Sequence, residues 1–201
     1  KEVLNFVHSD RSVFFVYVIL VAGWGMLIAS TEHDGGVVAS LWLVFFSVVI
    51  AANFASTVFV AERMTGSLEI LLTSGVSRVA IVYGKIAFVV VMTLLIGALC
   101  GGIGVMVRPL LRPESVSFRS IGVPVSHLFL YGSAALFNAS ASACFSVWLP
   151  NPRLLHFINL LILGAVMAGY VALSMVVALS LHAVSVLLAV AGAGFCILAQ
   201  R

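Results

Sequence analysis

Long apolar stretches alternate with short polar segments along the whole chain. A helix needs about twenty apolar residues to cross the hydrocarbon core of a bilayer. Six stretches approach that length, and they are 12–30, 38–61, 79–107, 122–149, 156–179 and 182–199. The pattern predicts an all-α, polytopic membrane protein of about six transmembrane helices. The break at 180–181 between the last two stretches is compatible with a tight turn between two spans or with a re-entrant hairpin.

Residues 1–11 precede the first apolar stretch and have a different pattern. Val3, Leu4 and Val7 are apolar, and the polar residues Glu2, Asn5 and His8 alternate with them. This spacing favours a short amphipathic helix that lies in the membrane interface. A disordered tail is the alternative. The chain shows no linker, repeat or low-complexity run, so we expect one membrane domain over residues 1–201.

Composition supports the membrane assignment. The chain is 63% hydrophobic and 8% charged, and its mean hydropathy is +1.24. A soluble domain has about a quarter of its residues charged, so a water-facing surface of this size would be short of charge. The net charge is +3, but the basic residues are scattered. The chain therefore lacks the basic stripe that nucleic-acid binding requires.

The distribution of Lys and Arg predicts the orientation, because cytoplasmic loops are enriched in these residues. With the N-terminus inside, the cytoplasmic positions are Lys1, Arg11, Arg63, Arg78, Lys85, Arg153 and Arg201. The opposite side holds Arg108, Arg112 and Arg119. We therefore expect cytoplasmic N- and C-termini in the cell inner, or cytoplasmic, membrane.

The polar loop 62–78 between the second and third spans carries the most distinctive pattern. Gly66 is placed to cap a short helix, and Glu69 then falls at its third position, near the positive end of the helix dipole. Gly75 is placed to end the helix in a left-handed conformation. One face of this helix carries Leu68, Leu71 and Leu72. Such a short helix needs a docking surface, either lipid headgroups, as a connector between spans, or a partner protein.

The loop reads E-R-x-x-G-S-L-E-x-L-L-x-x-x-V-S-R and is followed by G-K inside the next span. This resembles the signature of the type-2 ATP-binding-cassette (ABC) exporter permeases. The residues that carry the resemblance are Glu62, Arg63, Gly66, Ser67, Leu68, Glu69, Leu71, Leu72, Val76, Ser77, Arg78, Gly84 and Lys85. The segment 1–11 also resembles the interfacial elbow helix of that family, and 148–153 stands where the family has its second cytoplasmic turn. Gly75 departs from the pattern, since many relatives have proline there.

The resemblance implies a transmembrane permease subunit that works as a pair, as a homodimer or heterodimer, above two cytosolic ATPase subunits. Loop 62–78 would be the coupling helix, and its motif residues from Glu62 to Arg78 would contact the ATPase. We find no catalytic residue, and Gly84-Lys85 is not a P-loop because Ile86 replaces the required Ser or Thr. Lys85 is expected to reach toward the headgroups. ATP and magnesium would bind the partner, leaving this chain with no cofactor.

Four polar residues inside the spans are candidates to line a translocation path, because polar side chains rarely face lipid. They are Asn53, His127, Asn138 and Asn159. Hydrogen bonding between helices is the alternative. The three cysteines, Cys100, Cys144 and Cys196, have no metal-ligand spacing, so we expect them to pack as small apolar residues and to bind no metal.

Two alternative functions stay open at this point. One is a haem-exporter-like subunit of cytochrome maturation, which has a similar length and a related loop. The other is a membrane scaffold or secondary carrier outside the ABC class. The scarcity of charge in the spans is compatible with a lipid-like or amphipathic cargo, and the sequence leaves the cargo open.

Overall fold

The computed structural model describes residues 19, 21–26, 37–65, 75, 77–111, 125–148, 152–176 and 181–199. These residues are helical almost throughout, and no strand occurs among them. The helices are α3 (Val37–Thr65), α5 (Arg78–Leu111), α6 (Val125–Trp148), α7 (Pro152–Val176) and α8 (Leu181–Leu198). The predicted all-α fold is confirmed for this part of the chain.

Three of the described helices are long and apolar enough to cross a membrane. Their apolar segments are Trp42–Phe59 in α3, Val79–Val107 in α5 and Val125–Ser146 in α6, with mean hydropathies of 1.9, 2.6 and 1.3. Shorter apolar segments, Phe157–Ala172 and His182–Leu198, lie in α7 and α8. These helices indicate a membrane protein. Only residues 19 and 21–26 of the predicted first span are among the described residues, and they are helical.

The chain divides into two compact units, and α5 contributes residues to both. The larger unit holds residues 35–94 and 124–201, and the smaller one holds 1–34 and 95–123. In the smaller unit, Gly25 lies against α5 so closely that an added Cβ would stand 2.7 Å from Cγ2 of Ile103. Glycine is therefore required where the 21–26 segment meets α5.

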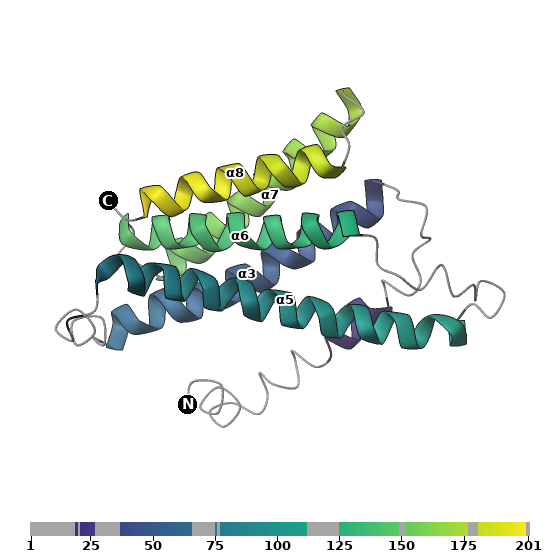
Figure 1. The fold of residues 1–201 in the computed structure, drawn as a ribbon, viewed down its shortest axis with the longest axis horizontal. Helices are drawn as coiled ribbons and strands as arrows, with labels where there is room; N and C mark the ends of the chain where they lie inside the picture. Colours follow the sequence, from purple (N-terminus) through teal and green to yellow (C-terminus); the bar gives the residue numbers. More distant parts are fainter. Residues whose placement is uncertain are drawn as a thin grey trace. The chain divides into compact units, whose positions relative to one another are not determined.

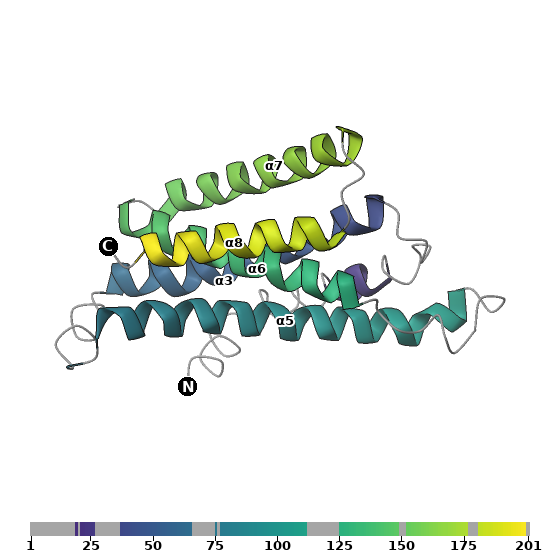
Figure 2. The same cartoon turned by 45° about the horizontal axis from the view of Figure 1, so that its top comes forward.

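In the larger unit, α6 is the central helix and packs against α3, α7 and α8 (Figure 1). The ends of α3, α6 and α8 and the starts of α5 and α7 lie at the same end of this unit, on the left in Figures 1 and 2. Successive helices in the unit therefore run in opposite directions. The segments that join α3 to α5 and α6 to α7 leave from one end of the bundle.

The apolar segment of α6 is more buried than those of the other two long helices, α3 and α5. Within its apolar segment 67% of the residues are buried, against 22% for the segment of α5. The buried polar residues of α6 are Ser133, Asn138, Ser140 and Ser142. Lipid is the outer solvent of such a bundle, so the polar side chains of α6 turn toward the neighbouring helices.

Two apolar clusters hold the larger unit together. The first core cluster joins α3, α5, α6 and α8, and its buried members are Ala51, Ala55, Phe59, Ile86, Val89, Ala139, Ala143 and Cys196. The second core cluster joins α3, α6, α7 and α8, and its buried members are Val44, Val48, Leu130, Ala134, Leu163 and Leu188. Small residues in the first cluster allow close approach of the helix backbones.

Candidate functional site: the coupling segment and the polar span residues

The predicted coupling loop 62–78 is partly described. Glu62 and Arg63 lie in the last turns of α3, which continues to Thr65, and Arg78 is the first residue of α5. The side chains of these three residues are outside the described part. The segment 66–74 and Val76 also lie outside the described residues. This segment holds the predicted contact residues Gly66, Ser67, Leu68, Glu69, Leu71 and Leu72.

Gly75 has a φ of +76°, the left-handed conformation that its place at the end of the loop predicts. Residues with a Cβ are strained in that conformation, whereas glycine is not. An added Cβ would meet no atom within 4 Å, so the requirement for glycine comes from the backbone and not from crowding. Gly75 therefore turns the chain just before α5 begins.

Ser77 caps the N-terminus of α5. Its side-chain Oγ accepts a hydrogen bond from the backbone N–H of Ala80 at 3.3 Å, and its carbonyl accepts one from Ile81 at 3.2 Å. The first bond satisfies a backbone donor that the first turn of a helix leaves free, and the second is the first intrahelical bond. From the sequence, Ser77 is predicted only as a motif residue that contacts the ATPase. A serine two residues before a long apolar run was the signal for this role.

The two helices that bracket the loop contact one another through side chains. Nζ of Lys85 in α5 lies 5.7 Å from the centroid of the Phe59 ring in α3. Phe59 and Ile86 both belong to the first core cluster, which continues to α6 and α8. A displacement of the loop would thus act on helices that are joined to the rest of the larger unit.

Asn53 is exposed on α3, and polar groups gather around it. Its Nδ2 donates to the carbonyl of Val49 at 2.9 Å. The carbonyl of Asn53 itself accepts bonds from the hydroxyls of Ser56 at 2.8 Å and Thr57 at 2.9 Å. Such back-bonding locally bends a helix. Asn53 and the exposed Thr57 form a polar patch on a membrane-length helix.

Asn138 and Asn159 lie inside the larger unit. Asn138 is 0% exposed, and its Nδ2 donates to the carbonyl of Val48 in α3 at 3.1 Å. Asn159 is 3% exposed, and its Oδ1 accepts a bond from the Ser142 hydroxyl of α6 at 2.8 Å. These are hydrogen bonds between helices, as the alternative interpretation expects. His127, in the first turn of α6, is half-buried.

The four polar residues predicted to line a path therefore do not form one cluster. Asn53 is exposed, while Asn138 and Asn159 are enclosed by α3, α6 and α7. His127 is about three helical turns from Asn138 along α6. Of the four side chains, that of Asn53 is the most accessible from outside the larger unit. Whether any of them lines a path stays a prediction.

The cysteines are free thiols, and two of them, Cys100 and Cys196, are buried. Sγ of Cys196 lies 3.0 Å from Oγ of Ser140, within hydrogen-bonding distance, where α8 meets α6. Within the described ranges, no three His, Cys, Asp or Glu side chains gather as metal ligands would.

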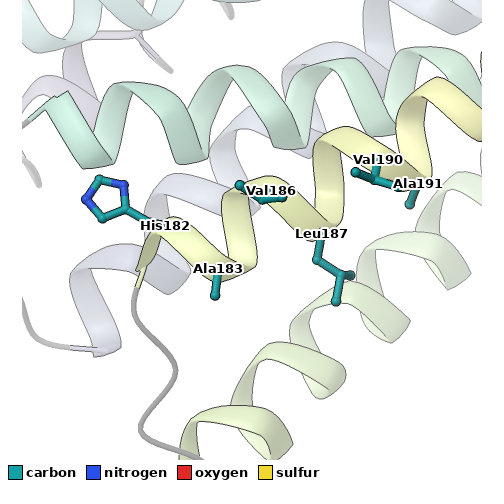
Figure 3. A pocket seen from close by; sticks show the side chains of 6 residues that line it. All are labelled: His182, Ala183, Val186, Leu187, Val190 and Ala191. Atoms are coloured by element: carbon teal, nitrogen blue, oxygen red, sulfur yellow. The ribbon is translucent and has the colours of Figure 1, made fainter.

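A shallow apolar groove runs along α8. Figure 3 shows its lining, which comes from this one helix and consists of His182, Ala183, Val186, Leu187, Val190 and Ala191. His182 is its single polar lining residue and stands at the start of α8. None of the four predicted path residues lines this groove.

Comparison with known proteins gives no relative. No protein-family model, no curated protein and no solved structure matches this chain.

Proposed function

We propose that the chain is the transmembrane permease subunit of an ATP-driven ABC exporter of type 2, working as a pair above separate cytosolic ATPase subunits. One observation carries this proposal: the motif of loop 62–78 is placed between two membrane-length helices, α3 and α5. The left-handed Gly75 and the capping Ser77 support it, because they give the loop a defined exit into α5.

The proposed coupling step follows from this placement. Leu68, Leu71 and Leu72 dock in a groove of the ATPase as an amphipathic helix, with Glu69 at the rim. Closure of the ATPases around ATP pushes on this helix. Because α3 and α5 both contribute to the first core cluster, the push tilts them together. ATP and magnesium bind the partner subunit, and this chain binds no cofactor.

The proposed topology has six spans and cytoplasmic N- and C-termini in the inner membrane. In the larger unit, α8 ends at the same end of the bundle as the two junctions α3–α5 and α6–α7 (Figure 1). That arrangement supports placing loop 62–78, the turn 148–153 and the C-terminus on one side. Segment 1–11, the proposed interfacial helix, lies outside the described residues.

The proposed path runs beside α3, between two copies of the chain. Asn53 and Thr57 are polar and exposed on a helix that is otherwise apolar enough to face lipid. A polar patch of this kind is costly against hydrocarbon chains. Pairing of two copies at α3 would remove that cost and place both patches along the seam.

A site-specific photo-crosslinker at Leu72 tests the proposal in native membranes. We expect a crosslink to a protein that carries a P-loop, and none from a crosslinker at Val190, which is 67% exposed on the apolar face of α8. The ATPase that the crosslink identifies is then reconstituted in vesicles with the chain. In these vesicles, Leu72→Asp should abolish ATP-dependent export. Absence of a P-loop protein, or export unchanged in L72D, overturns the proposal. Export driven by an ion gradient without ATP would favour the secondary carrier.

A further inference from the structure

Two asparagines in the larger unit each bury an amide atom without a hydrogen-bond partner. In the described part of the chain, Oδ1 of Asn138 and Nδ2 of Asn159 have no partner, although both side chains are at least 97% buried. The other amide atom of each is bonded, to Val48 and to Ser142. Each side chain is thus fixed by one bond, while its second polar atom remains in the interior.

The two asparagine side chains meet one face of α6. Ser142 follows Asn138 by four residues, so the two share one face of α6. The hydroxyl of Ser142 bonds the amide of Asn159, which brings the Asn159 side chain to this face. An acceptor and a donor therefore approach the same face of α6, and they are not bonded to each other.

The acceptor Oδ1 of Asn138 and the donor Nδ2 of Asn159 together determine which ligand could satisfy both atoms. A cation would satisfy Oδ1 of Asn138 but be repelled by the N–H of Asn159, and an anion would have the opposite mismatch. Water donates and accepts, so it satisfies both atoms. Buried polar groups in proteins are commonly bridged by ordered water. The need is greater in a membrane bundle, where bulk water does not reach the interior.

We propose that Asn138 and Asn159 hold a buried water that donates to Oδ1 of Asn138 and accepts from Nδ2 of Asn159. This water joins α6 to α7, while the amide of Asn138 joins α6 to α3. Both side chains are buried within one chain, so the water has a structural role between helices. The inference stands independently of the proposed function.

Water-edited solid-state NMR on Asn-labelled protein in lipid vesicles tests this site. Polarisation from water should build up quickly on the side-chain amide of Asn159, which the N159L spectrum assigns by its loss. Asn138→Leu removes the acceptor of the water, so the rapid build-up at Asn159 should be lost. Ser140→Ala is the matched control, because Ser140 is equally buried on α6 but bonds Leu136 and contacts Cys196; it should keep the build-up.

Two results overturn the proposal. One is a build-up at Asn159 in the unsubstituted protein that is as slow as that of amides in the apolar core. The other is an unchanged rapid build-up in N138L. The first measurement needs no substitution, so the proposal stays falsifiable if N138L fails to fold.

Discussion

Nζ of Lys85 lies 5.7 Å from the centroid of the Phe59 ring, which links α5 to α3 on either side of loop 62–78. A cation over an aromatic face gains about 0.5–1 kcal/mol at exposed sites and about 2 kcal/mol when desolvated. Lys85 is half-buried, so the contact lies between these limits. The sequence predicted only that Lys85 would reach toward headgroups, because the position of Phe59 depends on tertiary packing.

Replacing Phe59 with Leu should therefore lower the free energy of unfolding by about 1 kcal/mol beyond the loss of packed volume. The packing loss is separated by a double-mutant cycle with Lys85→Gln, measured by chemical unfolding in detergent micelles. We expect F59L to cost less in the K85Q background than alone. Equal costs in both backgrounds would show that the cation and the ring are not coupled.

Ser77→Ala should weaken the start of α5, because it removes the acceptor of the Ala80 N–H. Loss of such a cap costs about 1 kcal/mol. Hydrogen exchange of the Ala80 amide, followed by mass spectrometry, should become faster. Ser77→Asp keeps an acceptor at the cap and adds a favourable charge at the helix N-terminus, so it should retain protection. Exchange that is identical in S77A and the unsubstituted protein would exclude the capping role.

Under the proposed function, Gly75→Val should impair ATP-coupled export, because a β-branched residue is strained at a φ of +76°. The left-handed conformation costs about 1–2 kcal/mol for residues with a Cβ. Asparagine adopts it more readily, so Gly75→Asn should retain more export than G75V. Export by the two variants is compared in vesicles at matched protein amounts. If they lose export equally, the backbone conformation of Gly75 is not what the loop requires.

The sequence predicted the long helices well because lipid as a solvent leaves a strong signal in apolar run length. The stretch 79–107 falls inside α5, and 38–61 falls inside α3. Boundaries were also close for α6, which begins at Val125 where the apolar stretch begins at 122. The described residues contain three helices of membrane length, so the full count of six spans stays a prediction.

The role of α6 was harder to predict. Hydropathy ranks it lowest of the three long spans, at 1.3, although it is the most buried. A span that faces other helices has no need to be lipophilic, so its serines reduce hydropathy and mark its central position. The partners of Asn138 and Asn159, on α3 and α6, could not be deduced because interhelical bonds depend on register and rotation.

Gly192 lies where α8 approaches the backbone of α6, and its lack of a side chain permits this close contact. A Cβ added there would lie 3.1 Å from both Cα and N of Phe137, which are backbone atoms that a rotamer change cannot move. Gly194, two residues on, would meet no atom within 4 Å. The pair therefore compares the same substitution on two sides of one helix.

Gly192→Val should force α8 away from α6 and lower the free energy of unfolding by about 1–3 kcal/mol through overpacking. Gly192→Ala should cost less, because one methyl group needs a shift of only a few tenths of an ångström. Gly194→Val introduces the same β-branched residue into α8 without the contact and should stay close to the unsubstituted protein. Thermal unfolding in lipid nanodiscs ranks the three variants. Equal stabilities of G192V and G194V would mean that intrinsic helix propensity, and not the approach to Phe137, determines the cost at Gly192.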